Sequence, residues 1–161
     1  MARRGHRKAT AAKETVQAQA RRFIAKFEPR LQKLFGAARR ELRRRFPTAV
    51  ELIYDNYNFL VFGFCTTERP SDCFVSIAGQ AKGLVLSFYW GATLPDPHQL
   101  LQGSGNQNRF VRLPSPRTLR EPEVVELLLA AVAQAKVPLK KEGRGYTLVK
   151  SVSAKQRPRR Q

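Results

Sequence analysis

The sequence predicts a single α+β domain in which two N-terminal helices and one C-terminal helix pack against an antiparallel sheet of about five strands. Three observations support this prediction. Segments 10–28, 30–46 and 122–135 repeat their apolar residues at helical spacing. Short apolar or alternating runs, typical of strands, occupy residues 50–113. Brief turns separate these runs, and short connections favour antiparallel neighbours.

Prolines mark the ends of the first two helices. The first helix is expected to begin at about Thr10 and to stop before Pro29. Its apolar stripe consists of Val16, Ala20, Phe23, Ile24 and Phe27. The second is expected from about Arg30 to Phe46, with a stripe of Leu31, Leu34, Phe35, Ala38, Leu42 and Phe46. Its last two turns hold Arg39, Arg40, Arg43, Arg44 and Arg45, more cations than a helix C-terminus requires.

The middle of the chain is expected to form the sheet. Its strands are predicted at 50–57, 58–65, 73–78, 84–90 and 109–113. After Trp90, prolines and glycines interrupt regular structure until the last of these runs. Pro122 then suits the first position of the third helix. Beyond that helix, residues 146–152 either add an edge strand or form a partner-binding segment.

Charge divides the chain into three parts. Residues 1–13, a basic arm expected to be disordered, carry five Lys/Arg and no acid, and residues 136–161, a basic tail expected to be partly disordered, carry nine against one. Residues 14–135 form the predicted domain, and from residue 48 to its end acids outnumber Lys/Arg by eight to six. The net charge of +18 therefore resides mainly outside the predicted sheet.

This distribution favours a polyanionic partner, with nucleic acid as the first candidate. The candidate polyanion-binding residues are Arg39, Arg40, Arg43, Arg44, Arg45, Lys140 and Lys141. The alternative is that the basic flanks only keep the protein in solution. No apolar run approaches the roughly 18 residues that span a bilayer, and the N-terminus lacks the apolar core of a secretory signal. We therefore expect a cytoplasmic protein without a membrane span.

Three stretches resemble one known family. They are SFYWGATLPDP at 87–97, LQGSGN at 101–106 and RFVRL at 109–113. Together they resemble the YdhG-like family, also called domain of unknown function 1801, over roughly Phe23 to Ala135. The resemblance implies a small α+β domain with helices packed on an antiparallel sheet. Most members of the family have no assigned activity, which makes a non-catalytic binding or accessory protein the expected function.

Some members of that family look like frataxin-type proteins, which implies an alternative role as an intracellular iron carrier. Such a role requires clustered oxygen ligands. Residues 14–47, which contain the first two helices, carry ten Lys/Arg against three acids. The remaining acids are scattered along the sequence. The alternative role thus has few candidate ligands in this chain.

No residue pattern indicates catalysis, a cofactor or a metal site. Cys65 and Cys73 flank a turn and are interpreted as small buried residues, because a metal site would need two further ligands. Asp96 and His98 have no marked nucleophile nearby. Candidates for lining a pocket are Tyr89, Trp90, Asp96, His98 and Arg109.

The aromatic residues of the strands allow two further interpretations. If one sheet face is open, they provide a platform on which nucleic-acid bases stack. If both faces are covered, they belong to the core. These residues are Tyr54, Tyr57, Phe59, Phe88, Tyr89 and Trp90.

Overall fold

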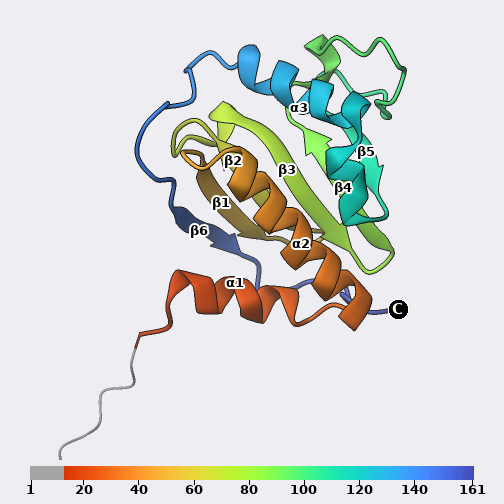
Figure 1. Cartoon of the computed structure of the whole chain (residues 1–161). Coiled ribbons are helices and arrows are strands. Elements are labelled where there is room, and N and C mark those ends of the chain that lie inside the picture. Colours follow the sequence, from red (N-terminus) through yellow and green to blue (C-terminus); the bar gives the residue numbers. More distant parts are fainter. Residues whose placement is uncertain (1–12) are drawn as a thin grey trace, which may run out of the picture.

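The computed structural model describes residues 13–161 and has the predicted α+β architecture. Helices α1 (Val16–Ile24) and α2 (Pro29–Arg45) come first, and α3 (Pro122–Ala133) follows the first five strands (Figure 1). The strands are β1 (Val50–Asp55), β2 (Leu60–Cys65), β3 (Cys73–Gln80), β4 (Gly83–Phe88), β5 (Arg109–Leu113) and β6 (Thr147–Val152). Short 3₁₀ helices lie at Pro70–Asp72 (η1), Gly91–Thr93 (η2) and Pro116–Arg120 (η3).

The sheet has six strands in the order β5-β4-β3-β2-β1-β6. Strands β1 to β5 form an antiparallel meander, as predicted. The sixth strand, β6, pairs in parallel with β1, so the sheet is mixed. A parallel neighbour needs a long return connection, and the chain supplies one through α3 and the segment that follows it.

The tail predicted at residues 136–161 belongs to the domain, which corrects the expected boundary at residue 135. Strand β6 lies within this segment, and Arg159 is buried with 5% exposure. The first helix also begins later than expected, at Val16. The predicted disordered arm at 1–13 falls almost entirely outside the described residues. Within residues 13–161, no helix is long and apolar enough to cross a membrane.

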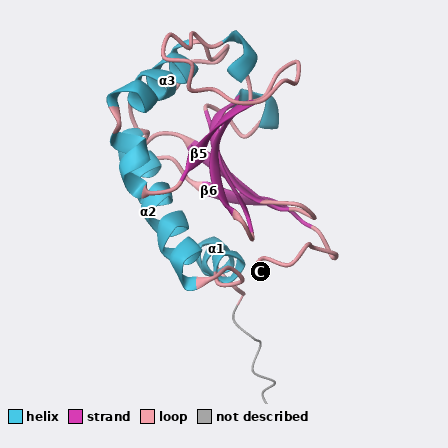
Figure 2. Cartoon of the chain, turned by 90° about the vertical axis from the view of Figure 1, so that its right-hand side faces the viewer, coloured by secondary structure: helices cyan, strands magenta, loops and turns pink. Residues whose placement is uncertain are grey.

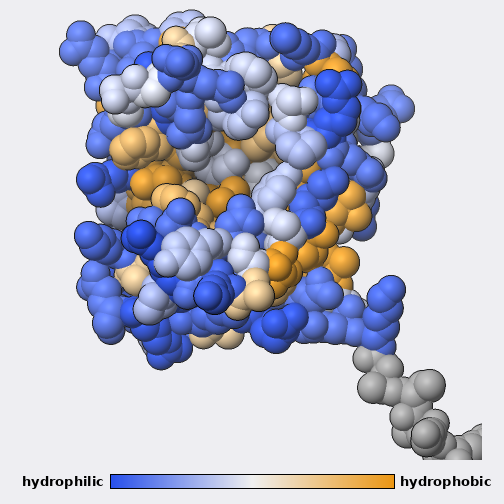
Figure 3. Space-filling view, turned by 180° about the vertical axis from the view of Figure 1, so that it is seen from behind, coloured by the Kyte–Doolittle hydropathy of each residue, from blue (hydrophilic) through white to orange (hydrophobic). Residues whose placement is uncertain are grey.

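All three helices lie on one face of the sheet (Figure 2). The opposite face, which we call the helix-free face, is shown in Figure 3; it is hollowed near its centre, and hydrophobic side chains gather on either side. The two layers explain the sequence pattern. Apolar stripes of the helices meet alternate strand residues on one face, whereas intervening strand residues form the other.

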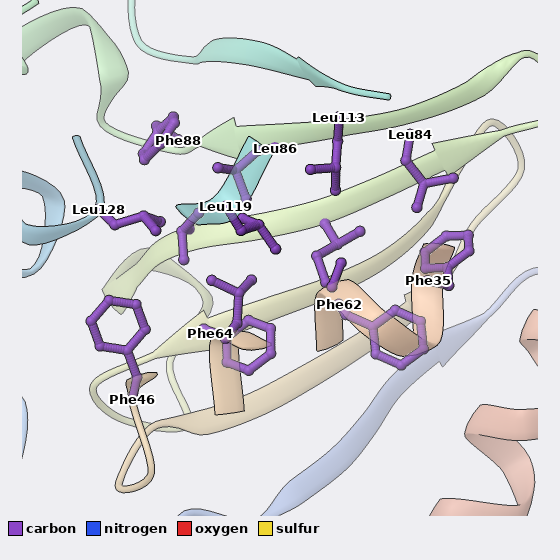
Figure 4. Packing of buried hydrophobic residues seen from close by; sticks show 14 of the residues in the cluster. Phe35, Phe46, Phe62, Phe64, Leu84, Leu86, Phe88, Leu113, Leu119 and Leu128 are labelled. Atoms are coloured by element: carbon purple, nitrogen blue, oxygen red, sulfur yellow. The ribbon is translucent and has the colours of Figure 1, made fainter. Parts of the chain in front are cut away.

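The main core lies between the helices and the sheet and is rich in phenylalanine. Figure 4 shows side chains from α2, the strands, η3 and α3 directed toward one another. Phe35 from α2 packs 5.7 Å from Phe62 of β2, ring centroid to ring centroid. Phe46, just after α2, meets Phe74 of β3 edge to face at 5.0 Å. Burying such rings contributes a large apolar area that stabilises the fold.

Candidate functional site

Two acidic residues of β1 are buried beneath the helices, where they form ion pairs with basic side chains. Arg39 of α2 donates two hydrogen bonds to the Glu51 carboxylate, from Nε to Oε2 at 2.8 Å and from Nη2 to Oε1 at 2.6 Å. The hydroxyl of Thr147 on β6 donates to the same carboxylate at 2.8 Å. Arg39 therefore joins α2 to the sheet. The sequence predicted Arg39 as a polyanion-binding residue, but its guanidinium is already bound to Glu51.

Asp55 is the second buried acid and has no exposed surface. Lys26 Nζ lies 2.6 Å from its Oδ2, and Arg159 Nη2 lies 2.9 Å from its Oδ1. Burial opposes ionisation, but hydrogen bonds from Lys26, Gln156 and Arg159 outweigh burial and lower the pKa of Asp55. The charge of Asp55 is thus balanced by Lys26 and Arg159, and the ion pair with Arg159 holds the C-terminal segment against the domain.

The remaining arginines of α2 divide into exposed and partly paired side chains. Arg40 and Arg43 are exposed. Arg44 pairs with Glu41 at 2.6 Å, yet its side chain keeps 68% of its surface exposed. Arg45 is mostly buried at 22% side-chain exposure and lies 3.7 Å from Glu41. Of the five arginines predicted to bind a polyanion, Arg40, Arg43 and Arg44 are available at the surface.

Two hollows on the helical layer join these arginines to others. A groove of about 420 Å³ between α1 and α2 is lined by Arg21, Arg40 and Arg43, together with part of Arg39. A second hollow of about 210 Å³, toward η3, contains Arg40, Arg44 and Arg120. Because Arg40 lines both, the hollows form one cationic strip. We call it the arginine ridge, and it consists of Arg21, Arg40, Arg43, Arg44 and Arg120.

Sequence reasoning missed two members of this ridge. Arg21 lies off the apolar stripe of α1, which signals exposure but does not indicate its neighbours. Arg120 ends η3, a 3₁₀ helix that the sequence did not predict. Lys140 and Lys141 are exposed in the connection before β6. The Lys140 carbonyl accepts a hydrogen bond from the hydroxyl of Thr48, which places this pair near the C-terminal end of α2.

The five residues predicted to line a pocket do not converge on one. Trp90 lines a hollow of about 290 Å³ between η1 and the end of α3, and its indole N–H donates to the Ser71 carbonyl at 3.0 Å. Tyr89 packs edge to face on Trp90 at 4.9 Å. Asp96 and His98 instead line a separate hollow beside α3. This part of the prediction is therefore wrong as a single site.

Asp96, His98 and Arg109 each have a structural partner. The Asp96 carboxylate accepts backbone N–H groups of Leu100 and Leu101 at 2.9 and 3.0 Å, which shapes the loop. His98 Nε2 lies 2.9 Å from the Glu126 carboxylate on α3. Arg109 donates to the backbone carbonyls of Gly105 and Asn108 and so braces the glycine-containing turn. These contacts supply an architectural role for each residue.

The two cysteines face each other across β2 and β3, as Cα partners next to a β-bulge. Both are buried. A hydrogen bond with Cys73, together with burial, raises the pKa of Cys65 well above its usual range. Among residues 13–161, no group of three or more His, Cys, Asp or Glu side chains is arranged to hold a metal ion. The cysteines are thus a packed pair of thiols.

The strongest surface feature of the helical layer is therefore the arginine ridge, whose groove between α1 and α2 is lined by no carboxylate. Comparisons with known proteins add no name to it: no family model, no curated protein and no solved structure matches this chain.

Proposed function

We propose that this protein is a non-catalytic accessory protein that binds nucleic acid by laying the sugar–phosphate backbone along the arginine ridge. The observation that carries this proposal is the groove between α1 and α2, where arginines gather without a carboxylate. Guanidinium groups bind phosphate through two parallel hydrogen bonds and stay charged at every physiological pH. A strip of them along one face suits a ligand with regularly repeated phosphates.

Acidic residues near the ridge are paired within the protein. Glu41, which lines the second hollow, pairs with Arg44. Glu51 and Asp55 are buried and bonded to Arg39, Lys26 and Arg159. The carboxylates of these two acids are thus screened from a ligand at the surface, while Arg21, Arg40 and Arg43 keep their donors exposed. A net charge of +18 would further accelerate encounter with a polyanion.

The test is fluorescence anisotropy with a labelled DNA duplex of arbitrary sequence, at about 50 and 200 mM salt. We expect the affinity to fall steeply as salt rises, because bound arginines release counterions from the phosphates. The double variant Arg40→Ser/Arg43→Ser should bind more weakly at low salt. Its slope of log affinity against log salt should be lower by about two, one for each lost phosphate contact.

Lys82→Ser supplies the matched control. Lys82 is exposed in the β3–β4 turn and lines neither hollow of the ridge, so its loss changes the net charge without removing a residue of the groove. Both proteins should keep the wild-type unfolding midpoint, because the substituted side chains are exposed. Absence of binding at low salt would show that the ridge is not a phosphate site. So would equal losses of affinity for Lys82→Ser and for Arg40→Ser or Arg43→Ser alone.

A further inference from the structure

The helix-free face of the sheet carries a second, chemically different surface. The strand registers place one row of side chains across it, from Arg112 on β5 through Val85, Ala78 and Val61 to Tyr54 and Ser151. The row is cationic at the β5 edge, apolar in the middle and aromatic near β6. Figure 3 shows this face of the sheet from behind, with a hollow near its centre.

Strand alternation assigns three of the four tyrosines in the chain to this face. Tyr54 belongs to the row described above, in which it is paired with Val61. Tyr89 directly follows Phe88, the last residue of β4, whose ring belongs to the core on the helical side, so alternation continued by one residue assigns Tyr89 to the helix-free face. Tyr146 likewise precedes Thr147, whose hydroxyl meets Glu51 beneath the helices. Tyr89 and Tyr146 remain exposed at 38% and 48%.

Tyr54 is the most enclosed of these three tyrosines. Burial raises the pKa of Tyr54, and the charges of Cys65, Cys73 and Tyr89 raise it further. The Tyr54 hydroxyl is buried and, among the described residues, has no hydrogen-bond partner. A buried hydroxyl without a partner costs free energy, which makes Tyr54 an unusual feature of this face.

Cations border the same face. Arg112 is exposed at the β5 end of the row, and Lys150 is exposed on β6. Arg69, after β2, keeps 74% of its side chain exposed. The nearby Glu68 carboxylate already accepts a hydrogen bond from the Tyr146 hydroxyl at 2.6 Å. An anionic ligand with flat apolar parts therefore complements this face better than a neutral or cationic one.

We propose that the helix-free face binds single-stranded nucleic acid, with bases stacked on Tyr89 and Tyr146 and phosphates near Arg112 and Lys150. Aromatic side chains on an open sheet face can hold unpaired bases, because every base has a flat π surface. A duplex keeps its bases stacked inside and cannot use this surface. The site lies on the opposite side of the sheet from the arginine ridge and is independent of it.

Trp90 provides a built-in probe for this interaction. It is the single tryptophan of the chain and contacts the Tyr89 ring at 4.9 Å. We expect a homopolymeric thymidine oligonucleotide to quench Trp90 emission in a saturable way, whereas a duplex of equal length should not. Tyr89→Ala and Tyr146→Ala should each weaken oligonucleotide binding about tenfold, measured by anisotropy, because each removes one stacked base.

Tyr57→Ala is the matched control, since Tyr57 is exposed at 49% but lies in the β1–β2 turn at the far end of the sheet. It should leave the affinity unchanged. Arg40→Ser/Arg43→Ser should weaken duplex binding while the Trp90 quenching by the oligonucleotide persists, so the two proposed sites can fail separately. Equal affinity of wild type and both face variants for the oligonucleotide would overturn the proposal. So would sedimentation showing a dimer that Tyr89→Ala dissociates, because a second copy would then occupy the face.

Discussion

Arg159, close to the end of the chain, donates a hydrogen bond of 2.9 Å to the fully buried carboxylate of Asp55 on β1. The same guanidinium also donates to the Asn56 carbonyl at 2.6 Å, and its centre lies 5.8 Å from the Phe27 ring centroid. A segment that composition alone marks as a basic tail is thus fastened to the first strand and to the turn between α1 and α2.

Replacing Arg159 with alanine should destabilise the fold by about 3 kcal/mol, because it leaves a buried carboxylate with one cation fewer. Lys26 stays bound to Asp55, so the loss should lie at the low end of the range for broken buried pairs. Urea unfolding followed by circular dichroism measures this change. Arg160→Ala is the control, since Arg160 is exposed and bonds only to backbone carbonyls. Equal stability of both variants would contradict a structural role for Arg159.

Asp55 should also make the protein sensitive to acid. Its pKa is lowered in the folded state, so its ionised form stabilises the fold at every pH above the unfolded-state value of about 3.9. This contribution is lost as the pH falls through the lower pKa of the folded protein. We expect the urea midpoint to fall more between pH 7 and pH 3 in wild type than in Asp55→Asn. Parallel midpoint curves for the two proteins would exclude Asp55 as the source.

The helices and the first five strands were predictable because their hydrophobic periods are clear and their connections are short. Strand β6 was harder to identify. Its partner β1 lies far away in the sequence, and its outer residues Lys150 and Val152 are exposed, so the sequence left open whether residues 146–152 form an edge strand or a partner-binding segment. Only its pairing with β1 shows that the domain extends beyond residue 135.

The candidate site was predictable in part. Five arginines near the end of α2 indicated a basic surface, but Arg39 and its neighbour Arg40 differ: Arg39 is paired with buried Glu51, whereas Arg40 is exposed. Arg39 lies one turn after Phe35, at the edge of the apolar stripe, and there it meets Glu51. The sequence alternation on β1 predicts a half-buried strand but does not show that Glu51 and Asp55 face the helices. Long-range ion pairs of this kind leave no local signal.

Gly79 on β3 should tolerate no side chain, because a Cβ there would lie 2.3 Å from the Phe35 ring of α2. Gly79→Ala forces that buried ring to move. Overpacking of this kind should lower the free energy of unfolding by about 1–3 kcal/mol, which urea unfolding measures. Gly105→Ala, where a Cβ meets no atom within 4 Å, should change little. Phe35→Leu should destabilise wild type but cost less in the Gly79→Ala background, since it removes the clashing atoms. Simple additivity of the two substitutions would contradict close contact between α2 and β3 at this point.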